Sequence, residues 1–387
     1  MKKLKENLIL LVLLSFTTVM LTACNQNAQV ENQFEKTVEY ATERAEAILG
    51  VPGITIALID AESGFTWAQG FGYADTINSI PVTADTVFMI GSISKPFTAI
   101  TVMQFVEEGL IDLDEPIITY LPDFNILPHP TNGGDYRNIT TRMILNHTAG
   151  LPRDYLDETI FTIENHDEAF LNNFLTSLST ETMIAEEGTG VSYSNVGFVI
   201  LGILVARVAG YDNHFEGFVN YTNEFLFEPL GLNRTSFVMN DEIVANSARP
   251  YVNHRLQYEG MAFANALPTG SMVTSANEMA VLMHTLLGDI KFDNGQFLQQ
   301  ESFNQMIDFD DGFSYHGRFF GLGFFQRVES SHIGHDGGIL GFRSEMIFDL
   351  DTGIGVFVTV NSQSGDGIPF LISEEILQHA INEKMGR

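Results

Sequence analysis

The sequence predicts an α+β protein in which both chain ends build one antiparallel sheet, flanked by helices, with an all-helical region inserted between. Three observations lead to this prediction. Two strand-like segments joined by a turn lie near the N-terminus, the middle alternates helical periods with Pro/Gly/Asn loops, and strand-like segments return near the C-terminus. With 387 residues, 45% of them hydrophobic, the chain is long enough to bury a large core.

The N-terminal elements are a helix, a hairpin and a second helix. Apolar residues recur at helical spacing from Phe34 to Ile48, and Gly50 with Pro52 ends that helix. Strands are predicted at 53–60 and 65–73, joined by a four-residue turn into a hairpin. The β-branched and aromatic segment 86–90 then leads into a helix that is apolar on nearly every side and ends near Gly109. We expect this second helix to be central and buried.

The middle and the end of the chain have different patterns. From about 112 to 287 the sequence predicts helices at 140–147, 167–178, 196–208, 214–227 and 276–287. After this helical region, strands are predicted at 321–327, 331–335, 342–349 and 353–361, followed by a closing helix at 368–381.

The first 24 residues indicate export and lipid attachment. Three lysines precede an apolar run at 8–20, which is shorter than the roughly 20 residues that a membrane span needs. Leu21-Thr22-Ala23-Cys24 looks like a bacterial lipobox, and Cys24 is the only cysteine of the chain. We therefore expect a lipoprotein signal peptide at 1–23, lipid on Cys24, a polar tether at 24–32 and a folded domain at 33–387. That places the domain on the extracytoplasmic face of the cell membrane; an uncleaved membrane anchor is the alternative.

Charge and composition exclude several classes of partner. A formal net charge of −30 argues against nucleic acid and against electrostatic binding to anionic lipid. His332, His335 and Asp336 invite a metal site, but the glycines among them oppose the helical turn that would bring the two histidines together. We therefore expect no metal and no cofactor, and we expect a monomer.

The first motif that carries chemistry is Ser92-x-x-Lys95, at the predicted start of the buried helix. Spacing i to i+3 on a helix puts two side chains on one face, so the Lys95 amine can lie over the Ser92 hydroxyl. A lysine whose pKa is lowered by burial can take the proton of that hydroxyl. The alternative is a helix cap followed by a surface lysine.

The second and third motifs follow in the helical region and near the C-terminus. Tyr193 and Asn195 stand two apart in a loop before a helix, where a phenol can share protons and an amide can hold a substrate carbonyl. The alternative is a packed tyrosine with Asn195 as helix N-cap. His335-Asp336-Gly337-Gly338 indicates the edge of a cleft, because glycines there let a substrate backbone come close. Since no Gly-x-Ser-x-Gly occurs, an α/β-hydrolase is disfavoured.

In their order and separations, these three motifs resemble those of the serine β-lactamase and penicillin-binding superfamily. The branch they are most similar to holds class C β-lactamases, D-alanyl-D-alanine carboxypeptidases and related esterases. Further stretches resemble landmarks of that branch, at 146–152, 228–232 and 267–272. The resemblance implies a β-lactamase/transpeptidase-like fold.

The resemblance also implies roles for individual residues. Ser92 would be the acylated nucleophile, Lys95 its proton partner, and Tyr193 the acid/base that also helps deacylation. Asn195 would hydrogen-bond the substrate, and the backbone N–H groups of Ser92 and Gly338 would form the oxyanion hole. His335, Gly337 and Gly338 would contribute to substrate binding at the cleft edge. His147 matches a structural landmark and is left outside the predicted site.

The function implied is an extracytoplasmic serine hydrolase that cleaves amide or ester bonds through an acyl-enzyme. It would be D-Ala-D-Ala carboxypeptidase-like or β-lactamase-like, with an esterase, a D-amino-acid amidase or a non-catalytic penicillin-binding scaffold as alternatives. Class C β-lactamases carry Lys-Thr-Gly where this chain has His335-Asp336-Gly337, which argues against efficient β-lactam hydrolysis. With an ordinary pKa of about 6.5, His335 would bind a substrate carboxylate as pH falls toward 6; Arg343 is the alternative partner.

Overall fold

The computed structural model describes residues 33–48, 50–154, 161–162, 166–252, 255–256, 263–288, 291–292, 295–309, 313–330, 332–365 and 367–387. The predicted signal peptide, Cys24 and the tether lie outside these described residues.

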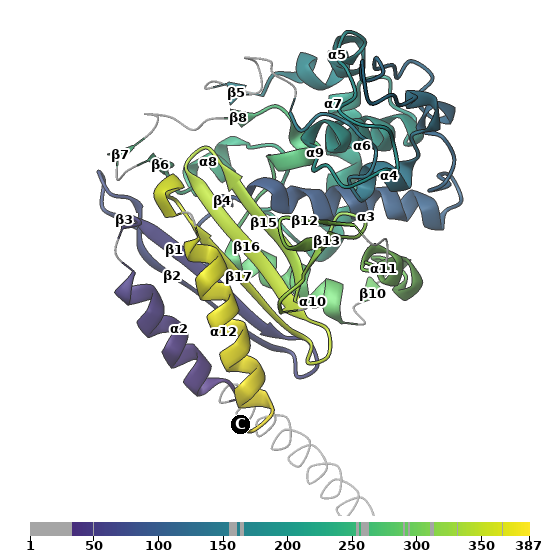
Figure 1. The fold of residues 1–387 in the computed structure, drawn as a ribbon. Helices are drawn as coiled ribbons and strands as arrows, with labels where there is room; N and C mark the ends of the chain where they lie inside the picture. Colours follow the sequence, from purple (N-terminus) through teal and green to yellow (C-terminus); the bar gives the residue numbers. More distant parts are fainter. Residues whose placement is uncertain are drawn as a thin grey trace, which may run out of the picture.

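A nine-stranded antiparallel sheet built from both chain ends forms the centre of the fold (Figure 1). Its strand order is β12-β13-β14-β15-β16-β17-β1-β2-β3. The two halves of the chain meet where β1 (Gly53–Asp60) pairs with β17 (Ile354–Val360), with Ile54 opposite Val360. The hairpin partner of β1 is β2 (Phe65–Asp75), which continues to the edge strand β3 (Ile80–Pro81). This arrangement confirms the predicted fold class.

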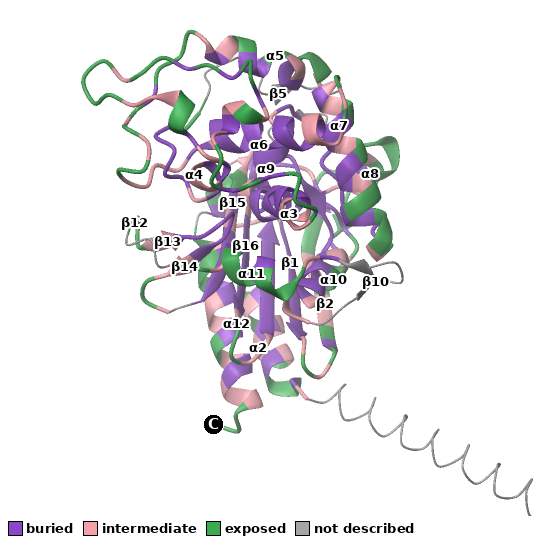
Figure 2. Ribbon diagram, turned by 90° about the vertical axis from the view of Figure 1, so that its right-hand side faces the viewer, coloured by how far each residue is buried: buried purple, intermediate pink, exposed green. Residues whose placement is uncertain are grey.

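Helices cover both faces of the sheet, as Figures 1 and 2 show. Every residue of β1 is buried, and its side chains alternate between two cores. Ile56 and Leu58 pack toward α2 (Glu35–Ala47) and α12 (Ile368–Lys384). Ala57 and Ile59 belong to the larger core on the other face, which includes α10 (Ala276–Leu287) and α3 (Ser94–Glu107). A strand covered on both faces has no polar side, which accounts for the apolar run in the sequence.

The helical region lies against α3 and contains α6 (Asn195–Val208), which is buried along nearly its whole length. Around it are α4 (Thr141–Leu145), α5 (Glu168–Leu178) and α7 (His214–Thr222). The predicted helix 214–227 changes after Thr222 into a π-helical turn, Asn223–Phe227. The short strand β4 (Phe88–Met89) lies in the β-branched segment 86–90. Helices and strands that the sequence did not predict are short: α8 (Asp241–Ala245), α9 (Leu267–Gly270), α11 (Gln300–Met306), β5 (Phe161–Thr162), β6 (Tyr251–Val252), β7 (Arg255–Leu256), β8 (Phe263–Ala264), β9 (Val273–Thr274), β10 (Lys291–Phe292) and β11 (Gly295–Gln296).

The C-terminal strands differ from the prediction in two places. Of the single strand expected at 321–327, only β14 (Phe325–Arg327) forms, and it is the last strand of a meander whose first two strands, β12 (Ser314–Tyr315) and β13 (Arg318–Phe320), were not predicted. Gly323, with φ 86°, turns the chain where a Cβ would lie 2.5 Å from Ala99. In addition, β15 (Ile333–Ile339) continues four residues past the predicted end, through its glycines, while β16 (Phe342–Asp349) lies where expected. Within the described ranges, every helix is too short or too polar to cross a bilayer.

Candidate active site

Ser92 lies in a single 3-10 turn, Gly91–Ile93, between β4 and the first residue of α3. The sequence prediction had placed it at the helix start itself. The turn is fastened by Ser94, whose hydroxyl donates to the Gly91 carbonyl at 2.7 Å and accepts from the Met272 N–H at 2.9 Å. Ser94 is therefore a buried support of the turn, while Ser92 faces a cavity.

Lys95 is fully buried in the first turn of α3. Its Nζ donates to Ser92 Oγ at 3.0 Å and to the Thr269 carbonyl at 2.7 Å. Burial lowers the pKa of Lys95 well below its ordinary value, because the charged amine is taken out of water. The contact between Lys95 and Ser92 agrees with the spacing argument, and the surface-lysine alternative is wrong.

Tyr193 enters the site from the loop before α6. Its phenol is hydrogen-bonded to Ser92, and Lys95 Nζ lies 4.9 Å from the centre of its ring. Burial raises the pKa of Tyr193, partly offset by the bond to Ser92, so the phenol keeps its proton at neutral pH. Two groups with opposite tendencies thus face one hydroxyl: a lysine that loses its proton readily and a tyrosine that holds its proton.

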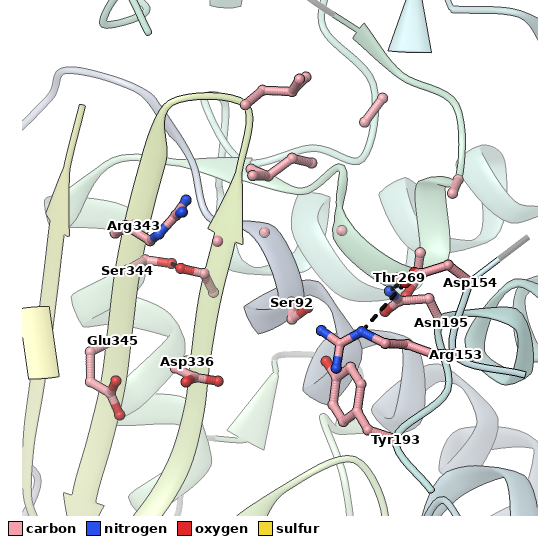
Figure 3. Close-up of a pocket in the computed structure, with 18 of the residues that line it drawn as sticks. Ser92, Arg153, Asp154, Tyr193, Asn195, Thr269, Asp336, Arg343, Ser344 and Glu345 are labelled. Carbon is pink, nitrogen blue, oxygen red and sulfur yellow. Dashed lines mark hydrogen bonds and ion pairs between the residues drawn. The ribbon is translucent and has the colours of Figure 1, made fainter. Parts of the chain in front are cut away.

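Asn195 is held in place by two neighbours (Figure 3). Its Oδ1 accepts from Thr269 Oγ1 at 2.9 Å, and its Nδ2 donates to the Asp154 carboxylate. The N-cap alternative is wrong, because Ser194 caps α6 by accepting from the Gly197 N–H at 2.9 Å. A chain of contacts therefore runs from Asp154 through Asn195 and Thr269 to Lys95.

Glycines bring β15 against the nucleophile turn. A Cβ at Gly337 would stand 1.9 Å from the Ile90 carbonyl oxygen, and a Cβ at Gly91 would stand 2.7 Å from the Gly338 nitrogen. Ser344 Oγ donates to the same Ile90 carbonyl at 2.7 Å and so joins β16 to the turn. The backbone of Gly338 therefore lies beside the Ser92 turn, where the predicted oxyanion hole requires it.

His335 is not where the sequence argument placed it. Its imidazole is 1% exposed and packs against Phe325 and Tyr193, behind the wall of the cavity. Nδ1 donates to the Asp336 carbonyl at 2.6 Å, and burial lowers the pKa of His335 to about 3. The expected titration near 6.5 is wrong, because that value assumed a solvated ring. His332 serves a different neighbour, Glu374, at 2.7 Å.

The cavity has a volume of about 920 Å³ and opens over Ser92 (Figure 3). Five predicted residues line it: Ser92, Tyr193, Asn195, Gly337 and Gly338. The charged residues in its lining, apart from Arg343, were missed by the sequence argument: Arg153, Asp154, Arg318, Asp336 as a lining side chain, and Glu345. Arg318 forms a two-pronged ion pair with Asp336, at 2.6 and 3.1 Å. Thr269 belongs to one of the recognised landmark stretches, which was the available signal for its place here.

This fold, with a serine, lysine and tyrosine converging beside the edge of β15, defines a protein of the β-lactamase and transpeptidase class. The family model described as Beta-lactamase matches residues 41–380. The chain belongs to that family.

Curated relatives match this chain at low identity. The unguisins hydrolase ungD of Aspergillus violaceofuscus is 26% identical over 277 residues, which are 68% of this chain and 46% of that protein. Penicillin-binding protein 4* of Bacillus subtilis is 28% identical over 181 residues, 46% of this chain and 37% of that protein. The matched regions thus span less than half the length of either relative.

Two solved structures share the fold over most of this chain. The D-amino acid amidase of Ochrobactrum anthropi SV3 superimposes with a TM-score of 0.69 at 23% identity, covering 92% of this chain and 99% of that one. An octameric penicillin-binding protein homologue of Pyrococcus abyssi gives a TM-score of 0.64 at 23% identity, covering 92% and 78%. At this identity the likeness concerns the fold.

Proposed function

We propose that this protein is a serine hydrolase that cleaves amide or ester bonds of D-amino-acid derivatives through an acyl-enzyme on Ser92. The observation that carries the proposal is the 3.0 Å contact between Ser92 Oγ and the buried amine of Lys95. A buried amine with a lowered pKa is the base that a serine hydroxyl needs at neutral pH.

In acylation, neutral Lys95 takes the Ser92 proton while Oγ attacks the substrate carbonyl carbon. The resulting oxyanion is stabilised by the backbone N–H groups of Ser92 and Gly338. When the bond to the leaving group breaks, the protonated Lys95 and the phenol of Tyr193 together supply the proton that the departing amine or alkoxide needs. The products of this half-reaction are the Ser92 ester and the free leaving group.

In deacylation, water attacks the Ser92 ester and transfers its proton through Tyr193 and Lys95 to Ser92 Oγ. Because both groups contact Ser92 in the resting structure, they can serve in either half-reaction. The ester bond breaks, the carboxylic acid leaves, and the original protonation state is restored.

The substrate class rests on the chemistry of the cavity walls. A neutral, buried His335 supplies no cation for the carboxylate of a β-lactam, and Asp336 lines the cavity beside it. The lining presents both signs of charge to a ligand, positive on Arg153, Arg318 and Arg343 and negative on Asp154 and Asp336. Such a lining suits a peptide or amino-acid amide better than a purely anionic substrate. Relatives named penicillin-binding protein and D-amino acid amidase support the same class.

A free D-amino-acid amide is a specific second candidate beside a D-Ala-D-Ala peptide. Asp154 is exposed at the cavity wall next to Asn195, where a carboxylate can receive the ammonium group of an unblocked amino acid. N-acetylation of the amide would remove that charge. A preference for the free amide over its N-acetyl form would select the amidase, and the reverse would select the carboxypeptidase.

The proposal is tested with four substrates: a D-Ala-D-Ala peptide, a D-amino-acid amide, a β-lactam and a small ester. We expect turnover of at least one of the first two, and covalent labelling of Ser92 by a fluorophosphonate, both abolished in Ser92→Ala. Ser94→Ala is the comparison variant: the Ser94 hydroxyl is buried and cannot be acylated, so labelling should persist in this variant, at a lower rate where the nucleophile turn loses its two hydrogen bonds. Absence of turnover and of labelling would leave the non-catalytic scaffold as the answer.

We further propose, from the lipobox and the single Cys24, that the enzyme is anchored by lipid on the extracytoplasmic face of the membrane. Cell-wall peptides would then be within its reach.

A further inference from the structure

His147 contacts Tyr193 and its chain neighbours but does not line the cavity. It is 2% exposed and stands just after α4, far from Tyr193 in sequence. Its ring packs on the Tyr193 ring with centroids 4.4 Å apart. Phe198 and Phe320 close the other sides of the imidazole, each with centroids 5.2 Å away.

The same residue holds both chain neighbours of Tyr193. The Ser192 N–H donates to the His147 carbonyl at 2.8 Å, and the Ser194 N–H donates to His147 Nδ1 at 3.1 Å. One residue therefore contacts the residue before Tyr193, the residue after it and the Tyr193 ring itself. Because the backbone N–H of Ser194 can only donate, Nδ1 must carry a lone pair, and the imidazole is the neutral tautomer protonated at Nε2.

The backbone of His147 adopts a left-handed conformation at the end of α4. Its φ is 65°, in the left-handed region that non-glycine residues rarely adopt. This conformation ends α4 in a Schellman motif, in which the Thr148 N–H donates to the Met143 carbonyl at 2.8 Å and the His147 N–H donates to the Ile144 carbonyl at 3.3 Å. Glycine and asparagine are the usual residues at such a helix end, so what the histidine adds here is its acceptor for Ser194 and its ring contact with Tyr193.

We propose that His147 is a positioning residue that fixes the Tyr193 phenol over Ser92 through Ser192, Ser194 and the ring contact. This inference rests on the proposed function, since it assigns His147 a task in the acylation and deacylation of Ser92. A misplacement of about 1 Å in a catalytic group can cost on the order of 10²-fold in rate. Nothing bound to the cavity needs to touch His147 for this effect.

Two substitutions separate the parts of the arrangement. His147→Asn keeps an acceptor, Oδ1, where Nδ1 stands, and asparagine tolerates positive φ. His147→Gly keeps the backbone conformation and the carbonyl but removes both the acceptor and the ring. Each substitution is made both in the wild-type protein and in the Tyr193→Phe variant. For every protein we measure the rate of Ser92 labelling by a fluorophosphonate, kcat and KM for the substrate that is turned over, and Tm.

In the wild type we expect His147→Gly to lower the labelling rate and kcat by about 10²-fold, with KM changed by less than about threefold. His147→Asn should recover at least about tenfold of that loss. In Tyr193→Phe, both substitutions should change the labelling rate by less than about twofold, because the group they position is already gone.

Equal losses in the two backgrounds, or full activity of both variants, would overturn the proposal. If His147→Gly does not fold, His147→Asn alone tests the proposal. His147→Asn lacks the ring that contacts Tyr193, so the proposal requires that any loss of labelling rate it causes in the wild type disappears in Tyr193→Phe. Failure of the proposed function has a different signature, because the wild type would then show neither labelling of Ser92 nor turnover.

Discussion

At the scale of single residues, Lys95 shows how this site is assembled at the expense of stability. Its amine is fully buried among the rings of Tyr193 and Phe198, with Nζ 4.9 and 5.6 Å from their centres. Among the residues that the structure describes, two acceptors reach it, Ser92 Oγ and the Thr269 carbonyl. An amine in such surroundings is kept neutral, and the proposed chemistry needs a neutral amine. Burying it costs folding free energy, which other parts of the fold must supply.

We expect Lys95→Met to lower the rate of Ser92 labelling by a factor on the order of 10⁴. The same substitution should raise Tm. Between the lowered pKa of folded Lys95 and its ordinary value, the unfolded chain binds a proton that the folded chain does not. The buried lysine therefore weakens folding at neutral pH and does so less as pH rises toward 10. Thermal unfolding at pH 7 and pH 10 measures this. The gain in Tm should be a few degrees at pH 7 and smaller at pH 10.

Lys36→Met is the control for that measurement, because Lys36 is exposed on α2. It should leave Tm unchanged at both pH values. A Tm of Lys95→Met below that of the wild type would contradict the reasoning.

A second residue-scale prediction concerns His335. Because burial lowers its pKa to about 3, His335 stays neutral throughout the range from pH 6 to 8. The ratio of kcat/KM for a carboxylate-bearing substrate to kcat/KM for a neutral ester should therefore be independent of pH in that range. His335→Asn, whose amide can donate to the Asp336 carbonyl as Nδ1 does, should leave the ratio flat. A ratio that rises toward pH 6 and flattens in the variant would restore His335 as the carboxylate partner.

At the scale of elements, the contact between β15 and the 3-10 turn of Ser92 holds the two sides of the site together. It depends on small residues, because the backbones of Gly337 and Ile90 approach closer than any Cβ permits. The strand prediction stopped at His335, since glycine is a poor strand residue on its own account. The strand continues because β16 pairs with it residue by residue, from Ile333↔Phe348 to Ile339↔Phe342.

Gly337→Ala should push β15 away from the nucleophile turn, since its Cβ would stand 1.9 Å from the Ile90 carbonyl oxygen. We expect a loss of kcat/KM of about 10²-fold or more together with a lower Tm. Gly190→Ala is the matched control: Gly190 lies near Tyr193 in sequence, but a Cβ there meets no atom within 4 Å. Wild-type activity in Gly337→Ala would mean that the oxyanion position does not depend on this approach.

At the scale of the whole molecule, the structure separates a scaffold from a site. The sheet and its two covering layers join the chain ends through β1 and β17, while the helical region supplies Tyr193, Asn195 and Thr269 to one side of the cavity. The expectation of a monomer stays a prediction, and one protein with the same fold is described as octameric. The lipid anchor likewise stays a prediction.

Cys24→Ser should abolish incorporation of labelled fatty acid and leave the signal peptide uncleaved or wrongly processed. The thiol is the group that would carry the lipid, and the chain has no second cysteine to replace it. Metabolic labelling followed by fractionation measures both effects. A wild-type protein that takes up no fatty acid would contradict the anchor, and would leave the hydrolase proposal untouched.

The sequence by itself determined the fold class and most of its elements, because these depend on local periodicity. Strand β1 and strand β16 lie where alternation and β-branched runs placed them, and the spacing of Ser92 and Lys95 brought those two side chains together. Three motifs in order were also enough to indicate the family that residues 41–380 match.

Tertiary structure alone decided the environments of these residues. The burial that lowers the pKa of His335 to about 3 comes from Phe325 and Tyr193, which lie on different elements. The hold of His147 on the loop of Tyr193 joins positions more than forty residues apart. The ion pair of Arg318 with Asp336 joins β15 to β13, a strand that the sequence did not predict. Solvent exclusion and cross-chain hydrogen bonds depend on which segments pack together, and no local pattern in a single sequence carries that information.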